Sequence, residues 1–118
     1  MKPKDYFDGK KPKGKVEEFA VAASYREEQE EATGTSKEGF QTVISKARRN
    51  WDARNFGRDI STARRKGFFT SGAGEEGQYV LSDYGQRYVD ALPDRAAAKA
   101  LPGGKRVGVK KKGKAARK

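Results

Sequence analysis

The segments ISTARRKGFF (residues 60–69) and YVLSDYG (residues 79–85) carry the information that decides the fold. The first begins with apolar residues at helical spacing and contains Gly67, where a helix can end. Two phenylalanines, a residue type common in strands, then follow. The second begins as a strand and reaches Ser82, a residue type that commonly caps a helix. Between them lies the glycine-rich stretch SGAGEEG (residues 71–77). These features predict a helix, a small β-hairpin with a glycine-rich tip, and a further helix.

Two more helices are predicted upstream, over about residues 15–32 and 35–50. In each, apolar residues recur at i, i+3, i+4 and i+7, which forms one stripe that can face a core. Thr35 and Glu38 have the spacing of a capping box, so we expect the second helix to start at Thr35. The polar second half of the first helix, residues 26–31, is expected to project into solvent.

The helix that contains ISTARRK is predicted to run from near Asp52 to Lys66. On a helical wheel, its apolar residues, among them Phe56 and Ile60, lie opposite a face of arginine and hydroxyl side chains. Gly57 lies within this helix, where we expect it either to weaken the helix or to permit close helix packing. Arg64 and Lys66 fall outside the polar sector, which comprises Arg54, Arg58, Ser61, Thr62 and Arg65.

The net charge of +11, from 27 Lys and Arg against 16 Asp and Glu, is unevenly distributed. Residues 1–15 carry net +4, residues 16–92 net −2 and residues 93–118 net +9. Both terminal segments contain Pro and Gly, and neither offers much apolar surface to offset the entropy of ordering it. We therefore predict a flexible basic arm over 1–15, a folded domain over 16–92 and a flexible Lys-, Ala- and Gly-rich tail over 93–118. Within the domain, acidic residues gather in 17–31 and basic residues in 37–66, so one negative and one positive face are expected.

The order of elements and the two segments quoted first resemble the winged helix-turn-helix family. In that family the recognition helix ends in a basic–Gly–apolar–apolar step, matched here by KGFF (residues 66–69). The second strand of the wing then leads into an aromatic–x–Leu–Ser/Thr–x–x–Gly helix start, matched by residues 79–85. The resemblance covers about residues 36–92. It implies a mainly α fold with a small β-hairpin, a DNA-binding function, and a recognition helix at about 53–66 whose groove-facing residues are Arg54, Arg58, Ser61, Thr62 and Arg65. A folded domain followed by a basic tail also resembles the arrangement of linker histones, and this second resemblance rests on composition alone.

The chemistry of these side chains independently suits double-stranded DNA. The major groove admits a helix, arginine can bond bidentately to guanine, and serine and threonine can bond to base edges or phosphate. Lys46, Arg48 and Arg49 are further candidates for DNA contact. We expect the tail to track the phosphate backbone without reading sequence. Its candidate residues are Lys105, Arg106, Lys110, Lys111, Lys112, Lys114, Arg117 and Lys118. The leading hypothesis is a transcriptional regulator or a nucleoid-associated, architectural protein.

The tip of the predicted wing is acidic, which opens an alternative. Glu75 and Glu76 would be repelled by a phosphate backbone, so the wing either stays off the DNA or faces a protein. The alternative function is a winged-helix module that binds protein or structured RNA within a larger nucleoprotein assembly.

Catalysis and membrane binding find little support in the sequence. The chain has no histidine and no cysteine, which removes the usual general base and the commonest metal ligands. The spacing of Gly72, Gly74 and Gly77 matches a dinucleotide fingerprint but lies in a hairpin tip, so we reject that function. The longest apolar run, residues 19–23, is far too short to cross a bilayer, and the tail has no apolar wedge. We expect an intracellular, non-enzymatic protein without cofactor, metal or membrane partner, in a bacterial or phage nucleoid or cytoplasm, or in a nucleus.

Overall fold

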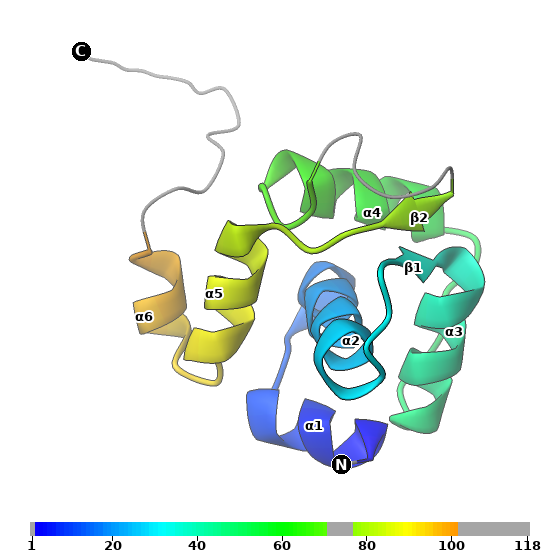
Figure 1. Cartoon of the computed structure of the whole chain (residues 1–118), viewed down its shortest axis with the longest axis horizontal. Coiled ribbons are helices and arrows are strands. Elements are labelled where there is room, and N and C mark those ends of the chain that lie inside the picture. The colour runs from blue at the N-terminus through cyan, green and yellow to red at the C-terminus, as the bar shows by residue number, and fades with distance from the viewer. Residues whose placement is uncertain (1, 71–76, 102–118) are drawn as a thin grey trace.

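Helix α2 (Gly14–Gln29) is the centre of the molecule, and the other helices are arranged around it in the computed structural model (Figure 1). The structure describes residues 2–70 and 77–101. Every residue of α2 from Glu18 to Tyr25 is buried, because helices pack against it from several sides. The five-residue apolar run 19–23 supplies apolar groups to all of these sides, and its three alanines permit close packing. The expected single apolar stripe was therefore too narrow, although the start of this helix was predicted to within one residue.

The N-terminal segment is folded, which corrects the prediction of a flexible arm over residues 1–15. Helix α1 (Pro3–Lys10) has Pro3 in its first turn and packs against α2. Tyr6 and Phe7 are buried, and the ring centroid of Tyr6 lies 5.5 Å from that of Tyr25 in an edge-on arrangement. Burying such rings contributes about 1.5–3 kcal/mol each, which offsets part of the entropic cost of ordering this segment.

Helix α3 (Lys37–Lys46) begins two residues later than predicted, because Thr35 belongs to a strand. Strand β1 (Thr35–Ser36) pairs in an antiparallel manner with β2 (Gln78–Tyr79). Ser36 then caps α3, and its Oγ accepts a hydrogen bond from the Gly39 amide at 3.2 Å. The capping residue is therefore Ser36 and not Thr35.

Helix α4 (Phe56–Arg65) is also shorter than predicted at its N-terminus. The carboxylate of Asp52 accepts hydrogen bonds from the backbone amide and the side-chain amide of Asn55, at 3.2 and 2.7 Å. Such a local turn competes with helix formation, so the helix starts at Phe56. In Figure 1, α4 lies along the top of the molecule, above α2.

The predicted hairpin is present as a small antiparallel arrangement completed by β1. Phe69 bridges to Leu81, and the amide of Thr70 donates to the carbonyl of Val80 at 2.9 Å. The pairing of β2 with β1 was not predicted from the sequence. Most of the glycine-rich connection, residues 71–76, lies outside the described residues.

The core is rich in aromatic rings. Phe19 and Phe40 lie at its centre, with ring centroids 5.3 Å apart. The helical and strand spacing of apolar residues in the sequence predicts a core of fourteen residues. Three of them, Val16, Trp51 and Tyr79, are only partly buried. The other eleven are buried: Phe19, Phe40, Val43, Ile44, Phe56, Ile60, Phe68, Leu81, Tyr88, Val89 and Leu92.

The last helices close the fold against α2. Ser82 caps α5 (Asp83–Ala91), as predicted, by accepting from the Gly85 amide at 2.9 Å. A Cβ at Gly85 would lie 2.3 Å from the carbonyl oxygen of Phe68, so only glycine allows this close approach. Helix α6 (Arg95–Lys99) follows, with Ala98 buried. The region 93–101 is therefore folded, and only residues 102–118 of the predicted tail lie outside the described residues.

Candidate nucleic-acid interface

Helix α4 has a buried side and an exposed side, as its sequence predicts. Phe56, Ile60 and Ala63 are buried together with most of Asp59. Ser61 and Arg65 are exposed, so the outward side of the helix carries a hydroxyl and a guanidinium. Because the ten-residue helix lies at the edge of the fold, this side is not covered by another described element.

Within the part of the chain that the structure describes, the hydrogen bonds along this side involve only neighbours on α4. The hydroxyl of Thr62 donates to the carbonyl of Arg58 at 3.0 Å, and Arg65 Nη2 donates to Thr62 Oγ1 at 3.3 Å. Arg58 Nε donates to Asp59 Oδ1 at 3.2 Å while its side chain remains 70% exposed. Among the described residues, no carboxylate ion-pairs with Arg65. The two arginines therefore keep guanidinium N–H groups available for an external acceptor.

The structure does not place Arg54 on this helix. It lies in the turn before Phe56 and is exposed. Its predicted position on the helical wheel assumed that the helix begins near Asp52, and the Asp52–Asn55 turn removes that basis. Arg54 is adjacent to the N-terminus of α4 in the chain, but it is not part of the regular face.

The predicted candidates Lys46, Arg48 and Arg49 lie elsewhere. The C-terminal end of α3 is next to α1, at the opposite end of the molecule from α4 (Figure 1). Arg49 is half-buried: its guanidinium lies 5.5 Å from the Phe7 ring centroid and 3.7 Å from Glu18 Oε2. The structure therefore separates these three residues from the exposed side of α4.

One residue near α4, Lys37, was missed from the sequence, and the structure adds detail on Arg64, Lys66 and Gly57. Arg64 and Lys66, assigned to positions outside the contact sector, are also exposed. Lys37 lies over the ring of Phe56, with Nζ 5.7 Å from the centroid, so it adds a positive charge where α4 begins. A Cβ at Gly57 would meet nothing within 4 Å, so this glycine does not serve helix packing. The approach of Lys37 to α4 depends on tertiary structure and has no local sequence signal.

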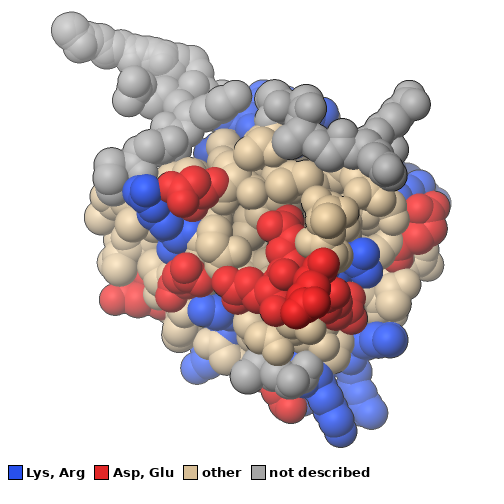
Figure 2. Space-filling model, in the orientation of Figure 1, with Lys and Arg blue, Asp and Glu red and all other residues tan. Residues whose placement is uncertain are grey.

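Acidic side chains gather on a different surface. Figure 2 shows them over the C-terminal end of α2, where Glu28, Glu30 and Glu31 are exposed. Glu27 is half-buried and accepts a hydrogen bond from the Leu81 amide at 2.9 Å, which links α2 to the segment after β2. Burial raises the pKa of Glu27, and the nearby charge of Glu28 raises it further, although the Leu81 amide opposes this. The expected negative face is thus confirmed, and part of it has a structural role.

Other parts of the predicted site lie outside the described residues. These are the acidic wing residues Glu75 and Glu76 and all eight basic tail residues between Lys105 and Lys118. Within residues 2–70 and 77–101, no three Asp or Glu residues form a group that could hold a metal ion. In the same ranges, no helix is long and apolar enough to cross a membrane.

We compared the chain with known protein families, curated proteins and solved structures. No family model, no curated protein and no solved structure matches the chain.

Proposed function

We propose that this protein binds double-stranded DNA with the exposed side of α4 in the major groove. The observation that carries the proposal is the pairing of a buried apolar side with an outward side bearing Arg58, Ser61 and Arg65 on one ten-residue helix. The major groove accepts one α-helix, and these side chains can donate to guanine, to other base edges or to phosphate oxygens.

The order of elements supports a winged helix-turn-helix arrangement. Helix α2 is followed by β1, α3 and α4, and then by two short extended segments that pair around a loop. Strand β1 pairs with β2, so the strand before α3 and the strand after the loop belong to one small sheet. In such an arrangement α4 takes the place of the recognition helix, which agrees with its position at the edge of the molecule.

The distribution of charge favours one orientation on DNA. The exposed acidic residues at the end of α2 would be repelled by phosphates, whereas α4 and its flanks carry Arg58, Arg64 and Arg65. We further propose that the eight basic residues between Lys105 and Lys118 add affinity that does not depend on base sequence. The protein would then be a transcriptional regulator or an architectural protein of the nucleoid.

One observation favours a second candidate function. The acidic surface of Glu28, Glu30 and Glu31 in Figure 2 is suited to a basic protein segment. The alternative is therefore a module that binds protein or structured RNA within a nucleoprotein assembly, with α4 as only one of its contact surfaces.

The test compares single alanine variants that each remove one positive charge. Arg58→Ala and Arg65→Ala lie on α4, while Lys46→Ala lies at the far end of α3 and serves as the control. A base-contacting arginine should cost about 1–3 kcal/mol in binding, and a phosphate-contacting one should lower the salt slope by about one unit.

Binding to duplex DNA and duplex RNA is measured at several salt concentrations. We expect the two α4 variants to bind duplex DNA several-fold to a hundredfold more weakly than Lys46→Ala. Equal binding by all three folded variants, or a preference for RNA that none of them alters, would contradict the proposal.

A further inference from the structure

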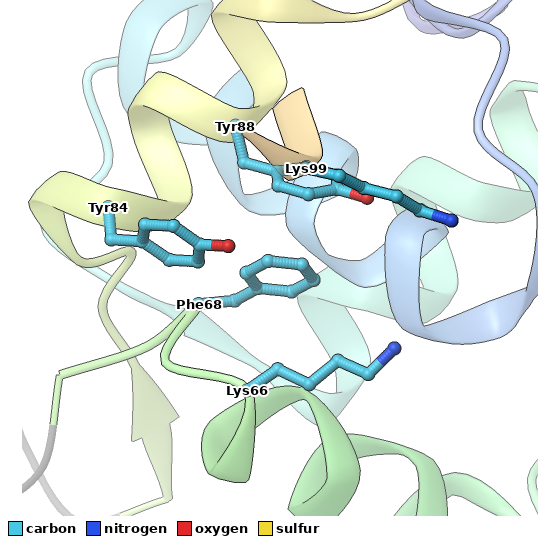
Figure 3. Close-up of a pocket in the computed structure, with 5 residues that line it drawn as sticks. All are labelled: Lys66, Phe68, Tyr84, Tyr88 and Lys99. Carbon is cyan, nitrogen blue, oxygen red and sulfur yellow. The ribbon is translucent and has the colours of Figure 1, made fainter. Parts of the chain in front are cut away.

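A pocket of about 200 Å³ lies where α4, α5 and α6 approach one another. It is lined by Lys66, Phe68, Tyr84, Tyr88 and Lys99, which are drawn in Figure 3. Its lining thus contains three aromatic rings and two ammonium groups, and no carboxylate. None of these side chains belongs to the exposed side of α4 that we propose for DNA.

The aromatic wall is fixed by the packing of the fold. Tyr84 and Tyr88 lie one turn apart on α5, so their rings project toward the same side. The ring centroid of Phe68 lies 4.8 Å from that of Tyr88 and 5.9 Å from that of Tyr84, the latter pair being nearly parallel at 19°. The close approach of the Phe68 backbone to Gly85 holds this arrangement, and the half-buried Tyr84 presents part of its ring to the pocket.

The two lysines supply positive charge to one side of this wall. In Figure 3 both side chains extend in the same direction, one from the end of α4 and one from α6, and their ammonium groups lie beyond the ring of Phe68. Among the described residues, neither lysine has an ion-pair partner. The nearby carboxylates are already engaged, because Glu17 pairs with Arg95 at 2.6 Å and Asp83 with Arg87 at 2.6 Å.

The hydroxyl groups of the two tyrosines differ in whether another residue already holds them by a hydrogen bond. Tyr88 donates to Glu17 Oε2 at 2.9 Å, so its hydroxyl is committed to the fold. No hydrogen bond from the hydroxyl of Tyr84 to another described residue is present. Tyr84 can therefore offer both a ring face and a hydroxyl to a molecule in the pocket.

We propose that this pocket binds a small planar aromatic molecule that carries an anionic group. The ring packs against the half-buried Tyr84, behind which Phe68 and Tyr88 are buried, and the carboxylate or phosphate lies between the ammonium groups of Lys66 and Lys99. The volume suits one ring or two fused rings, since it is below the roughly 300–1,000 Å³ of typical drug-sized sites. The same chemistry occurs in a free aromatic acid and in the 5′-phosphorylated end of a nucleic acid strand. The inference does not rest on DNA binding by α4.

The experiment is a titration of the full chain with phenyl phosphate, followed by calorimetry and by amide NMR shifts. Inorganic phosphate tests the charge alone, and benzyl alcohol tests the ring alone. We expect phenyl phosphate to bind at least tenfold more tightly than either, with shifts at Phe68, Tyr84 and Lys99. No binding of phenyl phosphate, or equal binding of inorganic phosphate, would overturn the proposal.

Variants of the residues that line the pocket show where phenyl phosphate binds, and these measurements need no duplex DNA. The double variant Lys66→Ala/Lys99→Ala should lose at least tenfold in affinity for phenyl phosphate, while Lys46→Ala/Arg48→Ala, which removes the same charge elsewhere, should not. Tyr84→Phe keeps the ring and should weaken binding by a few-fold. An unchanged affinity in Lys66→Ala/Lys99→Ala would overturn the proposal, even if α4 binds DNA.

A competition experiment distinguishes the two sources of the ligand. If the pocket receives strand ends, 5′-phosphorylated tetrathymidylate should displace phenyl phosphate, whereas the same oligonucleotide with a 5′-hydroxyl should not. If neither oligonucleotide displaces phenyl phosphate, the site is assigned to a free aromatic acid.

Discussion

Arg49 and Arg95 stabilise the fold, whereas Arg58 and Arg65 lie on its surface. Arg95 donates to both carboxylate oxygens of Glu17, at 2.6 and 3.1 Å, and its side chain is only 21% exposed. Arg49 lies over the ring of Phe7 and near Glu18. Arg58, by contrast, is 70% exposed and pairs only with the adjacent Asp59 among the described residues.

The difference teaches that a count of arginines does not identify a binding surface. What separates the two pairs is the presence of carboxylates on a neighbouring element. The N-terminal half of α2 supplies Glu17 and Glu18, which receive arginines from distant parts of the chain. No such carboxylate faces Arg65 among the described residues, so its charge remains directed outward.

The largest loss of stability is expected from a substitution in α1, beneath Arg49. Phe7 is fully buried and lies beneath Arg49, so Phe7→Ala should lower the free energy of unfolding by about 3–5 kcal/mol. Ile60→Ala, at a buried position of α4, should cost about 2–5 kcal/mol. Urea denaturation measures both. A negligible effect of Phe7→Ala would restore the view of residues 1–15 as a flexible arm.

A smaller loss of stability is expected when the Arg95 ion pair is removed. Arg95→Ala leaves the largely buried carboxylate of Glu17 with only Tyr88 and the Lys13 amide as partners among residues 2–70 and 77–101. It should cost about 2 kcal/mol in thermal or urea unfolding. Arg87→Ala is the matched control, because its ion pair with Asp83 is exposed and should contribute less than about 1 kcal/mol. Equal effects of the two variants would contradict the structural role of Arg95.

The pH dependence of stability tests the structural role of Glu17 and its partners in a second way. Burial opposes ionisation of Glu17, but hydrogen bonds from Arg95, the Lys13 amide and Tyr88 outweigh it and hold its pKa below the ordinary value of 4.5. The folded state therefore binds this proton more weakly than the unfolded state. The resulting stability is present above about pH 4.5 and is lost as the pH falls through the folded pKa. Unfolding measured from pH 7 to pH 2 should be less acid-sensitive in Glu17→Gln than in the parent, and parallel curves would refute this.

The smallest effect on stability is expected on the exposed side of α4. Arg65→Ala should change the free energy of unfolding by no more than about 0.5 kcal/mol, because surface side chains contribute little. Arg58→Ala should cost about 1 kcal/mol, because it also removes the hydrogen bond to the buried carboxylate of Asp59. Thermal unfolding checks this in the same samples that are used for DNA binding. A loss above about 2 kcal/mol would place these arginines with Arg49 and Arg95, as structural residues.

Local sequence features predicted several elements of the fold well. The spacing of apolar residues located α2, and Ser82 capped α5 as expected, because these signals act within one or two helical turns. The polar side of α4 at Arg58, Ser61 and Arg65 was also predicted, since helical periodicity alone determines it.

The errors have a common physical origin in contacts between distant segments. The burial of Tyr6 and Phe7 depends on α2 and on Arg49, and the pairing of Thr35 with Tyr79 depends on a strand 44 positions away. The prediction of a flexible arm over residues 1–15 gave too little weight to the two aromatic residues of that segment, Tyr6 and Phe7. Arg54 was misplaced for a local reason, because the Asp52 side chain forms a turn that ends the predicted extension of α4.

The proposed contact between α4 and DNA is tested most directly by an NMR titration of the full chain with a short duplex DNA, in which each backbone amide is followed. We predict that the largest shifts occur between Gly57 and Lys66, while the amides of Glu28, Glu30 and Glu31 and of Lys46 change little. Large shifts confined to the end of α2, to the end of α3 or to residues 102–118, with α4 unchanged, would contradict it.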